Sequence, residues 1–283
     1  MDSSDNQGQQ HQHPLLRSIG DTVKGKVVLV TGANRGIGKA FVESFLEHGA
    51  SKVYAAVRNV ESAEIAFQDR LVLQQQDNGC GVVVPIRLDM SDPERIKEIA
   101  ATITTDVDIV INNAGVLTRT TPLEGETAVE NLQYEMDVNV YGFLRLAHAF
   151  APILEQRNGT GVFVQINSVA SMRCPIINVS TYSASKAAAF SITQALRLEL
   201  GAKGVHVVSV HPGPIATDMV ADIPALMAIA PPPSVVAESL IDAITNTSLP
   251  PFLVYPDDKS KGLGKAYQSF ADIVIEQGNA YGE

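Results

Sequence analysis

The chain has 283 residues, of which 45% are hydrophobic, and its formal net charge is −10 at neutral pH. This length and composition suit one large α/β domain with a sizeable core. The acidic balance argues against nucleic acid or an anionic membrane as a partner, and no apolar run approaches the roughly 18 residues of a membrane span.

The cysteines, the histidines and the first residues of the sequence bear on location and metal binding. Cys80 and Cys174 form neither a disulfide framework nor a zinc spacing, and no signal peptide is visible, so we expect a cytoplasmic location. Residues 1–22 open with a stretch rich in Asp, Asn, Gln, Ser and His, which predicts a flexible polar tail before a single domain over residues 23–283. His11 and His13 lack a third ligand nearby, so no metal site is expected.

Short β-branched runs alternate with longer helical stretches from residue 26 to about residue 255. The predicted strands are residues 26–31, 52–57, 81–87, 108–111, 161–167, 205–210 and 252–255. Helical stretches are expected to begin near Gly36, Ser62, Asp92, Thr127, Val179 and Ser234. The pattern predicts an α/β doubly wound Rossmann fold, a seven-stranded parallel sheet with helices on both faces, whose ligands lie beyond the carboxyl ends of the strands.

A glycine-rich turn follows the first predicted strand, with the sequence Thr31-Gly32-Ala33-Asn34-Arg35-Gly36-Ile37-Gly38. Such a turn brings backbone N–H groups and a helix N-terminus up to a pyrophosphate, where the helix dipole favours negative charge. On its own the turn is weak support for a dinucleotide site. Its first two glycines are separated by three residues, where the common dinucleotide fingerprint has one.

The pattern T-G-x-x-x-G-I-G resembles the short-chain dehydrogenase/reductase family, in its branch of compact single-domain members. Four further family motifs follow in chain order between Gly25 and Tyr255: Asn112-Asn113-Ala114-Gly115, Asn139, Tyr182-x-x-x-Lys186 and Pro212-Gly213. The resemblance implies an oxidoreductase that moves a hydride between nicotinamide and a carbonyl or alcohol carbon. The cofactor-binding residues that it implies are Gly32, Asn34, Arg35, Gly36, Ile37, Gly38, Arg58, Asp89, Met90, Asn113, Ala114, Gly115, Tyr182, Lys186, Pro212, Gly213, Ile215 and Thr217.

Two arginines bear on the choice between NAD and NADP. Proteins that prefer NAD usually carry Asp or Glu about 20 residues past the glycines, whereas here Arg58 ends the second predicted strand and Arg35 lies in the glycine loop. Two guanidinium groups suit a 2′-phosphate, so NADP(H) is the expected cofactor. The alternative is a solvated Arg58 and a loop-capping Arg35. Asp89 either contacts the adenine amino group, as the resemblance implies, or is an acidic residue at the helix N-terminus before Pro93.

The predicted catalytic residues are Asn139, Ser168, Tyr182 and Lys186. Tyr182 and Lys186 lie four positions apart in a predicted helix, so the phenol and the ammonium share one face. A cation beside a phenol lowers a pKa that ordinarily lies near about 10. The resemblance implies that Ser168 donates to the substrate oxygen and that Asn139 anchors a water in a proton relay. Asn139 could instead be a structural helix residue, and Ser171 is a rival to Ser168.

The apolar segment 215–233 predicts a flexible lid over a hydrophobic substrate, because methionine adapts to varied shapes. The expected walls are Met219, Leu226, Met227 and Ile229 on one side and Met172, Pro175, Ile176 and Ile177 on the other. These residues could equally pack the core. The expected partner is a small carbonyl or alcohol compound. Because the family commonly forms dimers or tetramers through the helix near residues 127–154 and the helix that carries Tyr182, a homo-oligomer is also expected.

Two other functions compete with the oxidoreductase. A nucleotide-sensing regulator without turnover has no need of the complete set Asn139, Ser168, Tyr182 and Lys186. A serine hydrolase would use Ser168 and His211, but Ser168 is not part of a G-x-S-x-G turn. His211 is therefore expected to lie at a strand end without a catalytic role.

Overall fold

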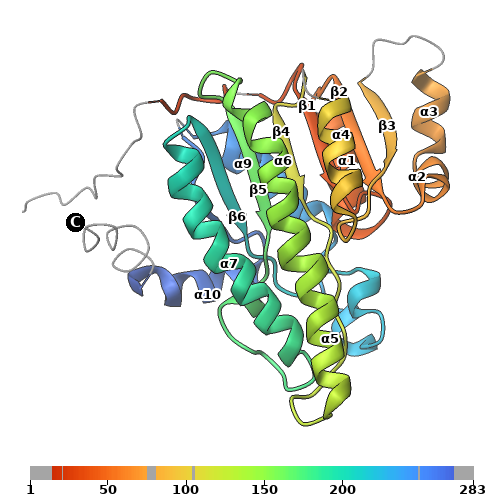
Figure 1. The fold of residues 1–283 in the computed structure, drawn as a ribbon, viewed down its shortest axis with the longest axis vertical. Helices are drawn as coiled ribbons and strands as arrows, with labels where there is room; N and C mark the ends of the chain where they lie inside the picture. Colours follow the sequence, from red (N-terminus) through yellow and green to blue (C-terminus); the bar gives the residue numbers. More distant parts are fainter. Residues whose placement is uncertain (1–14, 21, 75–80, 104–105, 248, 271–283) are drawn as a thin grey trace, which may run out of the picture.

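The computed structural model describes residues 15–20, 22–74, 81–103, 106–247 and 249–270. Its centre is one seven-stranded parallel sheet in the order β3-β2-β1-β4-β5-β6-β7 (Figure 1). The strands are β1 (Val27–Thr31), β2 (Lys52–Val57), β3 (Val82–Arg87), β4 (Ile109–Asn112), β5 (Gly161–Ile166), β6 (Val205–Val210) and β7 (Leu253–Val254). The predicted doubly wound sheet is confirmed, and every predicted strand end lies within 1 residue of the observed end.

Helices cover both faces of the sheet, as predicted. On one face lie α1 (Gly36–Glu47) and α9 (Ser234–Thr245), which bury Phe41 and Leu240 in one core cluster. On the other face lie α4 (Pro93–Thr102), α6 (Phe143–Glu155) and α7 (Ser180–Gly201), which bury Ile96, Phe150 and Phe190 in a second cluster. Figure 1 shows α6 and α7 in front of the sheet and α9 behind it. Strands covered on both faces account for the apolar β-branched runs in the sequence.

The remaining elements are helices, of which α2 and α5 were predicted. They are α2 (Val60–Ala66), α3 (Gln68–Gln74), α5 (Glu126–Met136), α8 (Pro224–Met227), α10 (Asp258–Phe270), a π-helix (Asp137–Gly142) and two 3₁₀ helices (Val169–Ser171 and Asp218–Val220). The six predicted helix starts lie within 2 residues of observed ones. The long helix expected near residues 127–154 is α5, the π-helix and α6 in succession. The π-helix carries Asn139, and such widened turns often occur at functional sites.

Part of the predicted N-terminal tail is packed against the domain. The Arg17 backbone N–H donates to the Gly159 carbonyl at 2.9 Å, and the Arg17 carbonyl lies 2.7 Å from His206 Nε2. Ile19 is buried in the first core cluster. Arg17 and Ile19, within the predicted tail, therefore contact the domain, and the boundary at residue 23 stays a prediction. The tail prediction for residues 1–14, with His11 and His13, lies outside the described residues, as does Cys80.

Other sequence-based expectations concern metals, thiols and membranes. Cys174 is a free, exposed thiol. Within the described ranges, no three His, Cys, Asp or Glu side chains gather as a metal site would require. In the same part of the chain, no helix has the length and apolar character needed to cross a bilayer.

Candidate active site

A cavity of about 970 Å³ lies beyond the carboxyl ends of the strands, within the size range of small-molecule sites. Every residue predicted to bind the cofactor lines this cavity, together with Ser168. Among the predicted catalytic and cofactor-binding residues, only Asn139 does not line it. Side chains chosen from motifs spread over most of the sequence are thus brought to one place.

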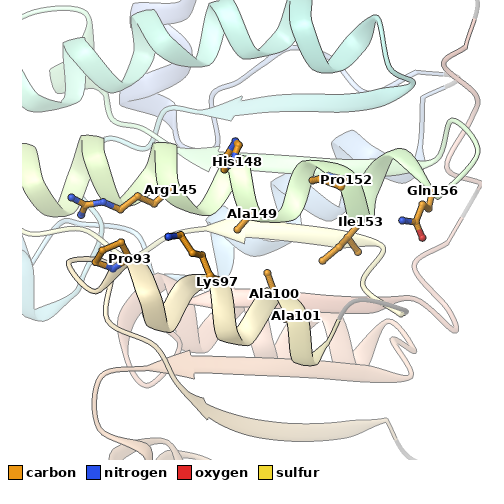
Figure 2. Close-up of a pocket in the computed structure, with 10 residues that line it drawn as sticks. All are labelled: Pro93, Lys97, Ala100, Ala101, Arg145, His148, Ala149, Pro152, Ile153 and Gln156. Atoms are coloured by element: carbon orange, nitrogen blue, oxygen red, sulfur yellow. The ribbon is translucent and has the colours of Figure 1, made fainter.

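A second cavity, of about 480 Å³, lies between α4 and α6 (Figure 2). Small and apolar side chains such as Ala149 and Ile153 line it, and its basic side chains Lys97 and Arg145 already form ion pairs with Glu94 and with Asp137, respectively. It contains no predicted site residue. The larger cavity is therefore the candidate active site.

The glycine loop between β1 and α1, called here the glycine cradle, leaves space that side chains at its glycine positions would fill. Gly32 and Gly36 have φ of +65° and +52°, a region that favours glycine. A Cβ on Gly38 would lie 2.0 Å from the Gly32 carbonyl oxygen, and a Cβ on Gly36 would lie 3.0 Å from Thr217 Cγ2. Backbone at the N-terminus of α1 therefore comes close to the cavity, as a pyrophosphate requires. The loop fits the diphosphate of a nicotinamide dinucleotide.

Buried polar side chains tie the ends of β1, β4 and β5 together beside this loop. Thr31 Oγ1 accepts hydrogen bonds from the backbone N–H groups of Asn113 at 3.0 Å and Ala114 at 2.9 Å. The Asn113 amide donates to the Thr31 carbonyl at 2.9 Å, and the Asn112 amide donates to Gln165 Oε1 at 2.7 Å. The Asn-Asn-Ala-Gly motif is thus fixed against the glycine loop. Thr31 was not among the predicted site residues, although it is the first residue of the glycine-rich motif that ends at Gly38.

Arg58 and Arg35 both line the cavity, as the NADP(H) prediction requires. Arg35 is not free, because its Nη1 lies 2.9 Å from Asp218 Oδ2 in the predicted lid segment, with 67% and 70% of the two side chains exposed. Such an exposed pair contributes little to stability. Arg35 therefore remains accessible to an anionic ligand that can displace Asp218.

Asp89 lies near Arg58, and the acidic residue in the first turn of α4 is Glu94, so Asp89 is not the helix N-terminal acid that was one of its two predicted roles. Its Oδ1 accepts from the backbone N–H of Ser91 at 3.0 Å and from the Ser91 hydroxyl at 2.8 Å. Asp92 caps α4 instead, by accepting from the Arg95 N–H. Partial burial acts to raise the pKa of Asp89, but the Ser91 hydrogen bonds and the charge of Arg58 outweigh it and hold the pKa below its usual value.

Tyr182 and Lys186 come from the first turns of α7 and are both buried. Lys186 Nζ lies 5.8 Å from the centroid of the Tyr182 ring and donates to the Ile166 carbonyl at 2.9 Å. Burial lowers the pKa of Lys186 to about 8. The predicted proximity of phenol and ammonium is present in the structure.

The sequence predicts that the pKa of Tyr182 is lowered. This direction is wrong when only the groups of the protein itself act on the phenol. Burial raises the pKa of Tyr182 to about 12, a hydrogen bond with the Ser168 side chain acts to lower it, and the charge of Glu135 raises it further. Desolvation of the phenolate dominates because the ring is enclosed. At neutral pH the phenol is therefore protonated.

Ser168 lies at the end of β5, where its hydroxyl faces Tyr182 and also accepts from the Ala170 N–H at 3.1 Å. Its rival Ser171 points elsewhere, donating to the Ser168 carbonyl at 2.5 Å and lying 3.1 Å from His211 Nδ1. His211 Nδ1 contacts the Ser168 carbonyl and not its hydroxyl, and burial lowers the pKa of His211 to about 4. His211 is therefore not placed to activate Ser168 as a nucleophile.

Asn139 is buried behind the cavity wall, with its amide engaged by the protein. Its Oδ1 accepts from the Val116 N–H at 2.8 Å, and its Nδ2 donates to the Val116 carbonyl at 2.9 Å and to Ser185 Oγ at 3.0 Å. A Cβ on Gly115 would lie 3.2 Å from Asn139 Oδ1 and 3.5 Å from Lys186 Nζ. The side chain thus braces the segment after β4 beside Lys186, and the water relay stays a prediction.

Two functional contacts were not predicted from the sequence. Asp257, after β7, accepts from the Gly213 N–H at 2.7 Å and so fixes the Pro-Gly segment. Arg119 forms two hydrogen bonds of 2.8 Å with the Asp222 carboxylate, which joins the segment after β4 to the predicted lid segment. Charge alone could have marked these residues as candidates, but the sequence offers no signal for their partners.

The predicted substrate walls are half correct. Met219, Leu226, Pro175 and Ile176 line the cavity. The other four predicted residues do not: Met172 packs against the second core cluster, and Met227, Ile229 and Ile177 are exposed at 39%, 69% and 70%. Leu117, Ile223 and Tyr134, which were not predicted, also line the cavity.

A doubly wound sheet, a glycine cradle at its carboxyl edge and a buried tyrosine–lysine pair in the same cavity define a dinucleotide-dependent oxidoreductase. The family model described as short chain dehydrogenase matches residues 26–227, and the chain belongs to this family. It is an oxidoreductase of the short-chain dehydrogenase/reductase type, a family that binds NAD(P).

Individual proteins show the same likeness. The chain is 31% identical over 194 residues to a 7alpha-hydroxysteroid dehydrogenase of Escherichia coli K12, covering 69% of this chain and 72% of the relative. A short chain dehydrogenase from Burkholderia cenocepacia in complex with NADP has a TM-score of 0.74 at 29% identity, covering 90% of this chain and 99% of that one. A 3-oxoacyl-[acyl-carrier protein] reductase from Brucella melitensis with bound NAD has a TM-score of 0.66 at 27% identity, covering 84% and 88%.

Proposed function

We propose that the protein is an NADP(H)-dependent carbonyl reductase that acts on hydrophobic ketones or aldehydes. The observation that carries the proposal is the buried Tyr182 phenol, held beside Lys186 and Ser168 in the cavity that contains the glycine cradle. A nucleotide sensor has no use for an enclosed proton donor of this kind. The serine hydrolase reading has no support, since His211 does not reach the Ser168 hydroxyl.

NADP(H) is favoured over NAD(H) by the positive charge at the adenosine end. Arg58 lines the cavity at the end of β2, where NAD-preferring folds usually place a carboxylate. Arg35 adds a second guanidinium. A 2′-phosphate could displace Asp218 from it, because the Arg35–Asp218 ion pair is exposed.

The residues act on the proton, and the bound NADPH supplies the hydride that reaches the carbonyl carbon. The Ser168 hydroxyl donates to the carbonyl oxygen, and Tyr182 transfers its phenolic proton to that oxygen as negative charge develops. Lys186 stabilises the resulting phenolate through its ammonium. A phenol with a pKa near 12 is protonated at neutral pH and so suits reduction better than alcohol oxidation.

The substrate is proposed to be hydrophobic because Met219, Leu226 and Ile176 line the outer part of the cavity. Methionine and leucine on a lid adapt to varied apolar shapes. The Escherichia coli relative, named for a hydroxysteroid, supports bulky alicyclic ketones as the first compounds to try.

Assembly and location also remain proposals. A homodimer or homotetramer through the α5–α6 and α7 helices is supported by exposed apolar side chains there, among them Tyr141, Leu144 and Leu198. The cytoplasmic location stays a prediction.

The test is a spectrophotometric screen of NADPH oxidation over alicyclic ketones, aromatic ketones and long-chain aldehydes, with NADH run in parallel. We expect turnover with at least one class of compound and a higher kcat/KM with NADPH than with NADH. Tight NADPH binding without consumption of NADPH by any compound would favour the nucleotide sensor. Hydrolysis of an activated ester that is lost in Ser168→Ala would favour the hydrolase.

A further inference from the structure

One buried histidine beside the active site has no part in the chemistry described so far. His211 directly follows β6 and is 0% exposed. Its ring packs edge-on against Phe190, with the ring centroids 4.6 Å apart, and its backbone N–H donates to the Val254 carbonyl at 2.8 Å. Both ring nitrogens also have polar partners. The imidazole is therefore held in one orientation, and its two nitrogens act on different neighbours.

The amide of Asn167 sets the direction of the hydrogen bonds behind this ring. Its Nδ2 lies 2.8 Å from Ser209 Oγ and 3.3 Å from Thr193 Oγ1. The Thr193 hydroxyl donates its hydrogen to the Ala189 carbonyl at 2.7 Å, so the Asn167 atom that faces Thr193 is the amide nitrogen. Asn167 therefore donates to the Ser209 hydroxyl oxygen.

This direction assigns the hydrogen of the imidazole to Nδ1. Ser209 Oγ lies 2.8 Å from His211 Nε2, and within the described part of the chain the Ser209 hydroxyl reaches no other acceptor. Its hydrogen therefore points to Nε2, which must be the acceptor nitrogen. Burial lowers the pKa of His211 to about 4, so the ring is neutral at neutral pH and carries one hydrogen. That hydrogen is on Nδ1.

The Nδ1 hydrogen points to the backbone of Ser168. Nδ1 lies 3.2 Å from the Ser168 carbonyl oxygen and 3.1 Å from Ser171 Oγ. Ser171 donates to the same carbonyl, from its hydroxyl at 2.5 Å and from its backbone N–H at 3.0 Å. A bare Nδ1 would set its lone pair against those of the carbonyl oxygen. His211 and Ser171 together therefore hold the Ser168 carbonyl in place.

A fixed carbonyl also fixes the direction of the Ser168 hydroxyl. Ser168 is extended, with φ −170° and ψ 159°, and its Oγ accepts from the Ala170 N–H at 3.1 Å. Rotation about the Cα–C bond of Ser168 would swing the carbonyl away from His211 and the Ala170 N–H away from Oγ. While both contacts hold, the hydroxyl keeps its hydrogen for the cavity that Ser168 lines.

We propose that His211 is a positioning residue whose Nδ1–H holds the Ser168 carbonyl, so that the Ser168 hydroxyl meets the substrate oxygen. His211 does not itself line the cavity, and it transfers no proton. A donor that stabilises developing charge loses most of its effect when it is displaced by about 1 Å. The inference rests on the proposed function, because it needs Ser168 to donate to the substrate oxygen during reduction.

The first test reads the tautomer of His211 in the wild-type protein, without a substrate. Nitrogen NMR of isotope-labelled histidine distinguishes a protonated from a bare ring nitrogen, and the His211→Asn protein identifies the signals of His211 by their loss. We expect a protonated Nδ1 and a bare Nε2 at neutral pH. A hydrogen on Nε2 overturns the proposal. A protonated Nδ1 in a protein that reduces no compound of the screen would fault the proposed function and leave the hydrogen-bond assignment standing.

The second test compares two amide variants of His211 in a single turnover of NADPH with a ketone. His211→Asn places an amide nitrogen near the position of Nδ1, whereas His211→Gln extends to the position of Nε2 and loses the donor at Nδ1. We expect His211→Gln to be at least about tenfold slower than the wild type and His211→Asn to stay within about threefold. The Kd for NADPH should stay within about twofold in both. His206→Asn is the matched control at another buried histidine, on β6, and keeps the wild-type rate.

A double variant with Ser168→Ala separates positioning from a general loss of structure. If His211 acts through the Ser168 hydroxyl, His211→Gln slows the Ser168→Ala protein by less than about twofold. The full slowing in that background overturns the proposal, and so do equal rates of the Gln and Asn variants. If His211→Gln does not fold, His211→Phe replaces it, because it keeps an aromatic ring and lacks the donor.

Discussion

The glycine-loop end of the cavity is shaped by backbone, whereas the lid end is held by side-chain ion pairs. A Cβ added to Gly38 would lie closer than 3 Å to the Gly32 carbonyl oxygen and to Asn113 Nδ2. At the other end, Arg119 and Asp222 join the lid to the segment after β4, with 25% and 54% of their side chains exposed. The nucleotide end therefore tolerates almost no change, and the substrate end can shift at small energetic cost.

This difference matches what each end has to recognise. A dinucleotide has one shape, so its site can be fixed by the sheet and by glycines that no other residue replaces. A reductase for varied ketones gains from a wall that adapts. Substitutions at the nucleotide end are therefore expected to have larger effects than substitutions at the lid end.

The largest effect is expected for Gly38→Ala. The new Cβ would lie 2.0 Å from the Gly32 carbonyl oxygen and 2.6 Å from Asn113 Nδ2, so the loop must move. We expect the Kd for NADPH, measured by fluorescence titration, to rise at least about 100-fold, or about 2.8 kcal/mol. Gly262→Ala is the matched control, because its Cβ would meet no atom within 4 Å. Wild-type affinity in Gly38→Ala would mean that the cradle is not the nucleotide site.

Arg58→Ala separates the two nicotinamide cofactors. Loss of a charge-assisted hydrogen bond, worth about 1.5–3 kcal/mol, should raise the Kd for NADPH about 10- to 100-fold. The Kd for NADH serves as the internal control and should stay within about twofold, since no phosphate is lost. Equal weakening of both cofactors would contradict the assignment of Arg58 to the 2′-phosphate.

The pH profile of ketone reduction tests whether the Lys186 ammonium is required. Lys186 lies between the glycine-loop end and the lid end of the cavity. Its pKa is lowered to about 8 by burial, so its ammonium is the major form below that pH and is lost above it. We expect kcat/KM for the ketone to fall about tenfold per pH unit above the Lys186 pKa. The measurement is a profile from about pH 6 to about pH 10 at saturating NADPH. A rate that is flat to the alkaline end would show that the ammonium is dispensable.

The smallest effect is expected for Asp222→Asn at the lid. The Arg119 guanidinium beside Asp222 holds the pKa of that carboxyl below its usual value, so the pair is ionised at neutral pH. Weakening a partly exposed pair should raise KM for the ketone by a factor of about two to five and leave the NADPH Kd unchanged. High salt should reduce the difference between wild type and variant. A loss of NADPH binding in Asp222→Asn would mean that the lid belongs to the nucleotide end.

The sequence predicted the nucleotide end well because its constraints are local. The β-branched run before Gly32 and the glycine spacing specify a strand, a turn and a helix within about a dozen residues. The side chains of Tyr182 and Lys186 share a helix face for the same reason. All the predicted cofactor-binding residues, together with Ser168, therefore line the observed cavity.

The rest depends on contacts between distant segments. Arg35 and Asp218 are 183 positions apart, and Arg119 and Asp222 are 103 positions apart, so no local pattern marks either pair. Glu135 looks like a surface residue in the sequence of an amphipathic helix, yet it is buried against Thr118. The same burial explains the wrong direction predicted for the Tyr182 pKa, because enclosure of the phenol outweighs the nearby ammonium.

The central claim is that Tyr182 protonates the substrate oxygen while hydride arrives at carbon. It is tested most directly by a single-turnover experiment in which enzyme already loaded with NADPH is mixed rapidly with a ketone found in the screen. Tyr182→Phe should keep the wild-type Kd for NADPH and oxidise it at least about 100-fold more slowly, as expected for a lost general acid. Oxidation at the wild-type rate in a Tyr182→Phe protein with unchanged NADPH affinity would contradict the account.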